Sequence, residues 1–166
     1  MTKADSYVYQ AVPDSKPPPH LCFRGCSHST VEPAEDVIEE ALNLFRPNSF
    51  NKSFEIKGPA DRTLVYLLLY IGDCLGHLTP EMPIATARQT LSRATLFSLP
   101  GEAGFPLNGM FPSPREEAEA LRSYLTSLRA ETRERLLGRL YVGDQKTPSK
   151  WWMAFQKRKF MNKSLN

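Results

Sequence analysis

Apolar residues recur at intervals of three and four along several stretches of the chain, which is the spacing that gives an α-helix one apolar face. The first stretch covers residues 33–45, and Pro47 is predicted to end it. The second covers residues 59–78, with Gly58 as its cap, and is apolar around nearly its whole circumference. A helix of that kind has to be surrounded by other elements, so this stretch is predicted as a buried central helix.

Two further stretches follow the central one. Residues 84–97 carry a weaker helical pattern. A long helix over residues 113–140 has the clearest start signal in the chain. Ser113, Pro114 and Glu116 there combine a capping box with a proline at the first helical position.

The two ends of the chain differ in character. A last helix is predicted to open at Thr147 and to continue into the basic residues near the C-terminus. Residues 1–30 are rich in proline and lack apolar periodicity, so they are predicted to form a flexible, disordered tail. Strand alternation is weak, with residues 50–56 the one short extended candidate. The prediction is an all-α fold, with residues 31–166 forming a single multihelical domain around the buried central helix.

The composition agrees with one globular domain, since 166 residues with 41% hydrophobic and 23% charged positions are ordinary for that class. The net charge of +3 is unevenly distributed, however. Six basic residues and no acidic ones follow from Lys146 onward, which leaves the preceding part of the chain at −3. This polarity favours a partner with an acidic surface.

The motifs of common catalytic sites do not occur. The sequence contains no Gly-Lys-Ser/Thr phosphate loop, no Gly-x-Ser-x-Gly elbow and no His-Glu-x-x-His. Glutamates between residues 116 and 134 alternate with arginines, which is typical of a solvated helix face. The longest apolar run, residues 64–71, is far shorter than the roughly 20 residues of a membrane span. We therefore expect no enzyme, no cofactor and no membrane span.

The cysteines favour a reducing compartment, because three of them cannot all pair within one chain. Two of the three belong to a cluster with the atoms of a tetrahedral zinc site, namely His20, Cys22, Cys26 and His28. Most such sites split their ligands into two pairs separated by a longer loop. The alternative is a polar tail with coincidental cysteines, and we predict no metal here.

The C-terminal segment carries the best candidates for binding. Large aromatic side chains beside cations suit docking onto an acidic protein surface, stacking on nucleic-acid bases or lying on an anionic membrane. The aromatic side chains would also be explained if both tryptophans simply completed the core. The favoured prediction is that one tryptophan lies in the core and the other in a contact with a partner. The predicted contact residues are Trp151, Trp152, Phe155, Lys157, Arg158 and Lys159, with Phe105 and Leu107 of a proline- and glycine-rich loop as secondary ones.

Three blocks of sequence point to a known family. They are FEIKGPADRTLVYLLLYIGDCL (residues 54–75), LPGEAGFPLN (99–108) and PSKWWMAFQKRKFMNKSL (148–165). In order and approximate spacing they resemble subunit 3 of the actin-related protein 2/3 complex, and the resemblance covers roughly residues 31–165. The N-terminus departs from the family pattern, because Cys26 follows Phe23-Arg24-Gly25 where a proline is expected.

The resemblance implies a non-catalytic, all-helical subunit of the assembly that nucleates branched actin filaments. It implies packing against actin-related protein 3, contact with the other subunits and nearness to the actin filament, in the cytoplasm at the actin cytoskeleton. It implies no nucleotide site and no metal. The alternative from the residues alone is a basic-tailed helical module that binds nucleic acid or another acidic partner.

Overall fold

The computed structural model describes residues 36–93, 98, 101–109, 118–143, 146–163 and 165. These residues form five α-helices, a terminal 3₁₀ turn and no strand, so the all-α prediction is confirmed. The elements are α1 (Val37–Asn48), α2 (Pro59–Gly76), α3 (Ile84–Arg93), α4 (Ala118–Leu140), α5 (Lys150–Met153) and η3 (Phe160–Asn162).

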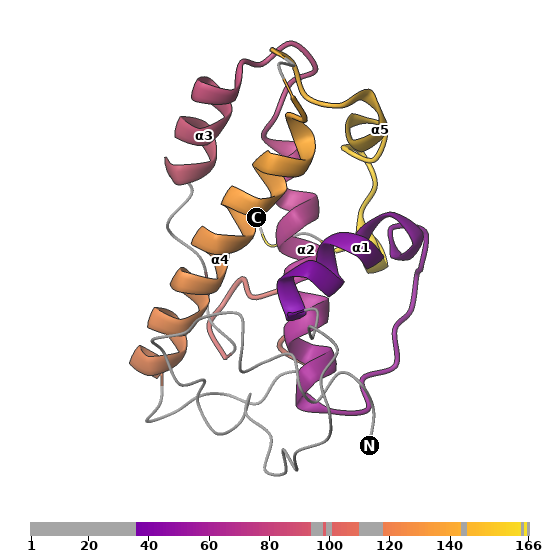
Figure 1. Cartoon of the computed structure of the whole chain (residues 1–166). Helices are drawn as coiled ribbons and strands as arrows, with labels where there is room; N and C mark the ends of the chain where they lie inside the picture. Colours follow the sequence, from indigo (N-terminus) through magenta and orange to yellow (C-terminus); the bar gives the residue numbers. More distant parts are fainter. Residues whose placement is uncertain are drawn as a thin grey trace, which may run out of the picture.

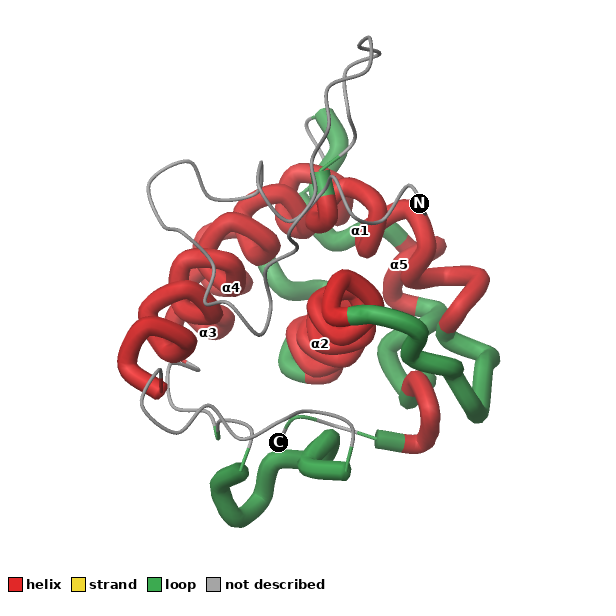
Figure 2. Tube along the Cα trace, turned by 90° about the horizontal axis from the view of Figure 1, so that it is seen from below, coloured by secondary structure: helices red, strands yellow, loops and turns green. Residues whose placement is uncertain are grey.

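Helix α2 is the centre of the fold, as predicted. Seen along its axis, it lies between α1 and α5 on one side and α4 and α3 on the other (Figure 2). It contacts α1, α4 and η3, whereas α3 packs on α4 (Figure 1). Its buried residues lie on every side of the helix and include Leu64, Val65, Tyr66, Leu67, Leu68, Leu69, Tyr70, Ile71, Cys74 and Leu75.

The start of α2 follows the predicted capping pattern. Gly58 is the cap residue and Pro59 the first helical one. The carboxylate of Asp61 accepts hydrogen bonds from the backbone N–H of Gly58 at 3.0 Å and of Lys57 at 2.8 Å. A negative side chain in the first turn also faces the positive end of the helix dipole.

Helix α1 starts and ends differently from the prediction. Asp36 is its cap residue and accepts a hydrogen bond from the backbone N–H of Glu39 at 2.8 Å. The expectation that Pro47 ends the helix is wrong, because Pro47 lies inside its last turn. Two side chains satisfy carbonyls at this end: Asn48 donates to Leu44 O at 3.0 Å and Ser49 to Arg46 O at 2.7 Å.

The other boundaries are partly confirmed. Helix α3 spans Ile84–Arg93, and the remaining predicted positions, 94–97, lie outside the described residues. The predicted start of the long helix at Ser113, Pro114 and Glu116 also lies outside them. The short extended piece predicted for residues 50–56 is not a strand.

The predicted final helix is present, but its bounds are wrong, because α5 spans only the four residues Lys150–Met153. After it the chain continues in four-residue turns, with the backbone N–H of Gln156 donating to Met153 O at 3.1 Å and that of Arg158 to Phe155 O at 2.9 Å. The side chain of Gln156 also donates to the Leu78 carbonyl at 2.6 Å, which ties the segment to the end of α2. Lys157, Arg158 and Lys159 therefore lie beyond the end of α5 and do not share a helix face.

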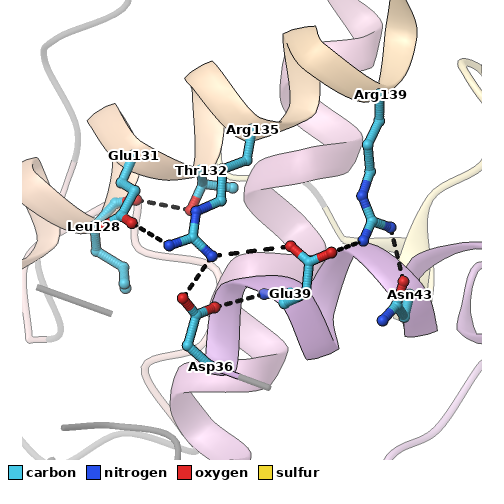
Figure 3. A network of polar contacts seen from close by, with 8 residues as sticks. All are labelled: Asp36, Glu39, Asn43, Leu128, Glu131, Thr132, Arg135 and Arg139. Carbon is cyan, nitrogen blue, oxygen red and sulfur yellow. Dashed lines mark hydrogen bonds and ion pairs between the residues drawn. The ribbon is translucent and has the colours of Figure 1, made fainter. Parts of the chain in front are cut away.

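An ion-pair network joins α4 to α1 across the fold (Figure 3). Arg135 contacts Asp36 at 2.5 Å and pairs with Glu131 one turn away on its own helix. Arg139 pairs with Glu39 and donates to the Asn43 side chain at 2.8 Å. The charged face of α4, predicted to be solvated, is thus partly used for packing between helices.

Candidate interaction surface

The two adjacent tryptophans of α5 lie in opposite environments. Trp152 is 7% exposed, and its ring stacks on Phe45 of α1 with the centroids 6.0 Å apart and the planes at 13°. The guanidinium of Arg46 lies 5.6 Å from the same ring. Trp151 is 77% exposed. One tryptophan therefore completes the core, and the other projects from the surface.

The two candidate residues of the proline- and glycine-rich loop are also buried within this chain. Phe105 is 4% exposed and Leu107 is 1% exposed. The loop is closed by Asn108, which accepts from the backbone N–H of Gly101 at 2.6 Å and donates to Glu102 O at 2.8 Å. The side chains of Phe105, Leu107 and Trp152 belong to the core, and a contact role for them remains a prediction.

The three consecutive cations, in contrast, are exposed beside the end of α1. Lys157, Arg158 and Lys159 line an open hollow of about 450 Å³ together with the turn that follows α1. We call this feature the basic hollow, and its lining residues are Ser49, Phe50, Asn51, Lys52, Lys157, Arg158, Lys159 and Asn162.

The backbone holds the two walls of the basic hollow together. The N–H of Met161 donates to the carbonyl of Asn51 at 3.0 Å. Met161 and Asn162 both adopt left-handed conformations, with φ of 53° and 54°, which turn the chain sharply at this point. Next to them Phe160 is buried and meets Phe54 edge-on, with centroids 6.0 Å apart. The positions of the cations are thus set by contacts between segments far apart in sequence.

Five of the eight lining residues were not among the predicted contact residues, and two of these five, Phe50 and Lys52, are aromatic or cationic. Phe50 is 58% exposed, and its ring meets Phe155 edge-on at a centroid distance of 5.9 Å. Lys52 follows two positions later and is exposed. The sequence signal that could have indicated Phe50 and Lys52 as contact residues was their position directly after the end of a predicted helix. Nothing in the sequence spacing predicted that they would lie next to residues 157–159.

A smaller hollow of about 90 Å³ lies beside the first one, against α2, and shares Arg158 and Lys159 with it. Asp73 lines it, and burial raises the pKa of this carboxyl above its ordinary value. The neighbouring Cys74 is buried, and burial raises the pKa of its thiol to about 12. This thiol is therefore protonated at neutral pH and inert as a nucleophile.

Two further expectations concern metals and membranes. Among the described residues there is no group of three or more His, Cys, Asp or Glu side chains that could hold a metal ion. The cluster of His20, Cys22, Cys26 and His28 lies outside the part of the chain that the structure describes. No helix within that part is long and apolar enough to cross a membrane.

The described structure defines a class of protein: an all-helical domain whose most distinctive surface is basic and aromatic. Comparison with known proteins identifies the family within this class. Residues 16–165 match the family model P21-Arc, described as the ARP2/3 complex ARPC3 (21 kDa) subunit. This match reaches into the segment predicted as a tail.

Curated relatives agree with the family model. The chain is 46% identical over 147 residues to actin-related protein 2/3 complex subunit 3 of Schizosaccharomyces pombe, covering 86% of this chain and 84% of the relative. It is 46% identical over 137 residues to the Saccharomyces cerevisiae protein of the same name, covering 78% and 77%. The Arabidopsis thaliana protein is 44% identical over 144 residues, covering 84% and 82%. The chain belongs to the family of the 21 kDa subunit of the ARP2/3 complex.

Proposed function

We propose that this chain is a non-catalytic structural subunit of the actin-related protein 2/3 complex, which supports actin-related protein 3 in the nucleation of branched actin filaments. The observation that carries the proposal is the family match over residues 16–165. The relatives with 44–46% identity over more than three quarters of this chain bear the name of that subunit. The place of action would be the cytoplasm, at the actin cytoskeleton.

The structure supports a scaffolding role in physical terms. The core around α2 is filled by aliphatic and aromatic side chains, and the basic hollow and the smaller hollow beside it are open to the surface. The exposed features include Trp151, Phe50 and the cations of the basic hollow, which suit contact with an acidic protein surface. Actin-related protein 3, the other subunits and the actin filament are the proposed partners.

The proposal is tested by assembly. The full chain, carrying a tag, is co-expressed with the other subunits of the fission yeast complex in place of their own subunit 3, and the tagged material is purified at moderate salt. Stoichiometric recovery of both actin-related proteins, with formation of actin branches by the purified material, is the expected result. Omission of any subunit 3 and inclusion of the yeast subunit are the two controls. Elution of this chain alone, while the yeast subunit assembles, would refute the proposal.

A further inference from the structure

The basic hollow has an unusual charge distribution for this molecule. Four of its eight lining residues are cations and none is acidic. Within the described part of the chain none of the four forms an ion pair, whereas most arginines of α3 and α4 do, for example Arg88 with Glu134 and Arg122 with Glu102. The positive charge of the hollow is therefore not neutralised by described neighbours, and the concave shape concentrates it.

An apolar platform lies within these charges. The Phe50 ring is 58% exposed but is held on two sides, by the edge-on ring of Phe155 and by the guanidinium of Arg158 at 4.9 Å from its centroid. An exposed aromatic side chain of fixed orientation loses little conformational entropy on binding, and such residues serve as anchors in protein interfaces. The hollow thus offers a rigid apolar contact with cations around it.

We propose that the basic hollow binds an extended acidic segment of a partner protein. Its carboxylates would pair with Lys52, Lys157 and Lys159, and an apolar side chain of the same segment would pack on Phe50. The argument for this occupant is charge complementarity together with the size of the hollow, about 450 Å³, which is in the range of sites for small ligands and peptide side chains.

Two other occupants fit the surface less well. An anionic bilayer binds most strongly to apolar and cationic groups that lie together on one helix face, whereas these cations line a concavity and lie outside the helices. A nucleic-acid strand needs a series of stacking platforms along a basic track. The hollow provides one exposed ring, and the rest of the chain before Lys146 carries a net charge of −3.

This inference goes beyond the proposed function, because it assigns a ligand chemistry to one surface and is tested on the full chain alone. The probe is a short synthetic peptide of glutamates with one central leucine, carrying a fluorophore whose anisotropy reports binding. Vesicles of mixed neutral and anionic lipid, single-stranded DNA and the same peptide with serine for leucine are the comparison ligands. Circular dichroism of every variant checks that the fold is unchanged.

The variants form a matched pair. Lys157→Glu/Lys159→Glu reverses two charges inside the hollow, and Lys146→Glu/Lys150→Glu makes the same change in net charge at exposed positions outside it. We expect the first pair to weaken peptide binding by about tenfold or more and the second by less than about threefold. Phe50→Ala is expected to abolish the preference for leucine over serine.

The outcomes separate clearly. Peptide binding that falls with salt and depends on the hollow variants supports the proposal. Equal losses from both charge variants would overturn it, because binding would then follow net charge alone. Absence of peptide binding, or hollow-dependent binding of vesicles or DNA in its place, would overturn it as well. In each of these cases the subunit role is untouched, since the assembly test does not use the peptide.

Discussion

Arg129 of α4 donates a hydrogen bond from Nε to the hydroxyl of Tyr66 on α2 at 2.7 Å, and both side chains are buried. The guanidinium also lies 4.7 Å from the ring centroid of Tyr70 and 5.5 Å from that of Tyr66. A cation from the charged face of α4 is thus held against the aromatic part of the central helix. This contact links the two longest helices at a depth where water does not compensate for its loss.

Arg129→Met is expected to lower the free energy of unfolding by about 2–4 kcal/mol, because it leaves a buried tyrosine hydroxyl without this donor. Urea denaturation followed by circular dichroism measures the change. Arg122→Met on the same helix is the matched control. Its guanidinium is exposed and pairs with Glu102 at 2.9 Å, so its loss should cost less than about 1 kcal/mol. Equal effects of the two substitutions would contradict the buried role of Arg129.

The adjacent tryptophans give a second prediction. Trp152→Ala removes a ring stacked on Phe45 in the core and should destabilise the fold by about 3–5 kcal/mol. Trp151→Ala removes a 77% exposed side chain and should change stability by less than about 0.5 kcal/mol. Thermal unfolding of the two variants distinguishes them, and a fully stable Trp152→Ala protein would be inconsistent with the stacked geometry.

Stability at high pH follows from two buried acids. Burial raises the pKa of Tyr66 from 10.0 to about 12, against the opposing effect of Arg129, and burial raises the pKa of Cys74 from 9.0 to about 12. Each group keeps its proton longer in the folded than in the unfolded chain. Their stabilising contribution is therefore complete below pH about 9 and is lost as the pH rises toward about 12.

The slope of that loss is about 1.4 kcal/mol per pH unit for each group. Cys74→Ala removes the loss of stability that begins near pH 9, where the Cys74 thiol of the unfolded chain ionises. The variant should therefore lose less stability than the parent chain between pH 8 and pH 10, an interval that spans this ionisation. Urea unfolding at these two pH values provides the test. A parent chain with the same stability at both would refute the prediction.

The network between α1 and α4 predicts a salt-dependent contribution to stability. Arg135→Met removes contacts with Asp36 and Glu131 and should cost about 1 kcal/mol at low salt, and less in high salt because exposed charges are screened. Arg88→Met breaks the pair with Glu134, in which both side chains are about half exposed, and should have little effect. A cost of Arg135→Met that does not vary with salt would point to lost packing in place of lost charge.

The elements most accurately predicted from sequence are those whose signals are local. The start of α2 at Pro59 depends on Gly58 and Asp61, which are neighbours in the chain, and its burial follows from apolar residues on every side. The family could be recognised in the same way, since it rests on contiguous blocks of sequence.

The final segment shows where such reasoning stops. Its tryptophans and basic run were expected on one helix, yet α5 ends at Met153. The reason is tertiary: Trp152 is held by Phe45 of α1, and Gln156 by a carbonyl at the end of α2. These contacts make a turn after Met153 more stable than a continuation of the helix, and no local sequence pattern encodes them.

The amino-acid sequence by itself determined the all-α class, the central position of α2, the uneven charge and the family, because each follows from periodicity, composition or contiguous blocks. Only the tertiary structure decided which tryptophan is buried, that Arg129 enters the core, and that Phe50 and Lys52 join residues 157–159 in one basic hollow. Those features arise from contacts between segments some sixty to one hundred and ten residues apart, such as Arg129 with Tyr66 and Met161 with Asn51. Packing in three dimensions selects such pairs, and their spacing in the chain carries no period from which they can be inferred.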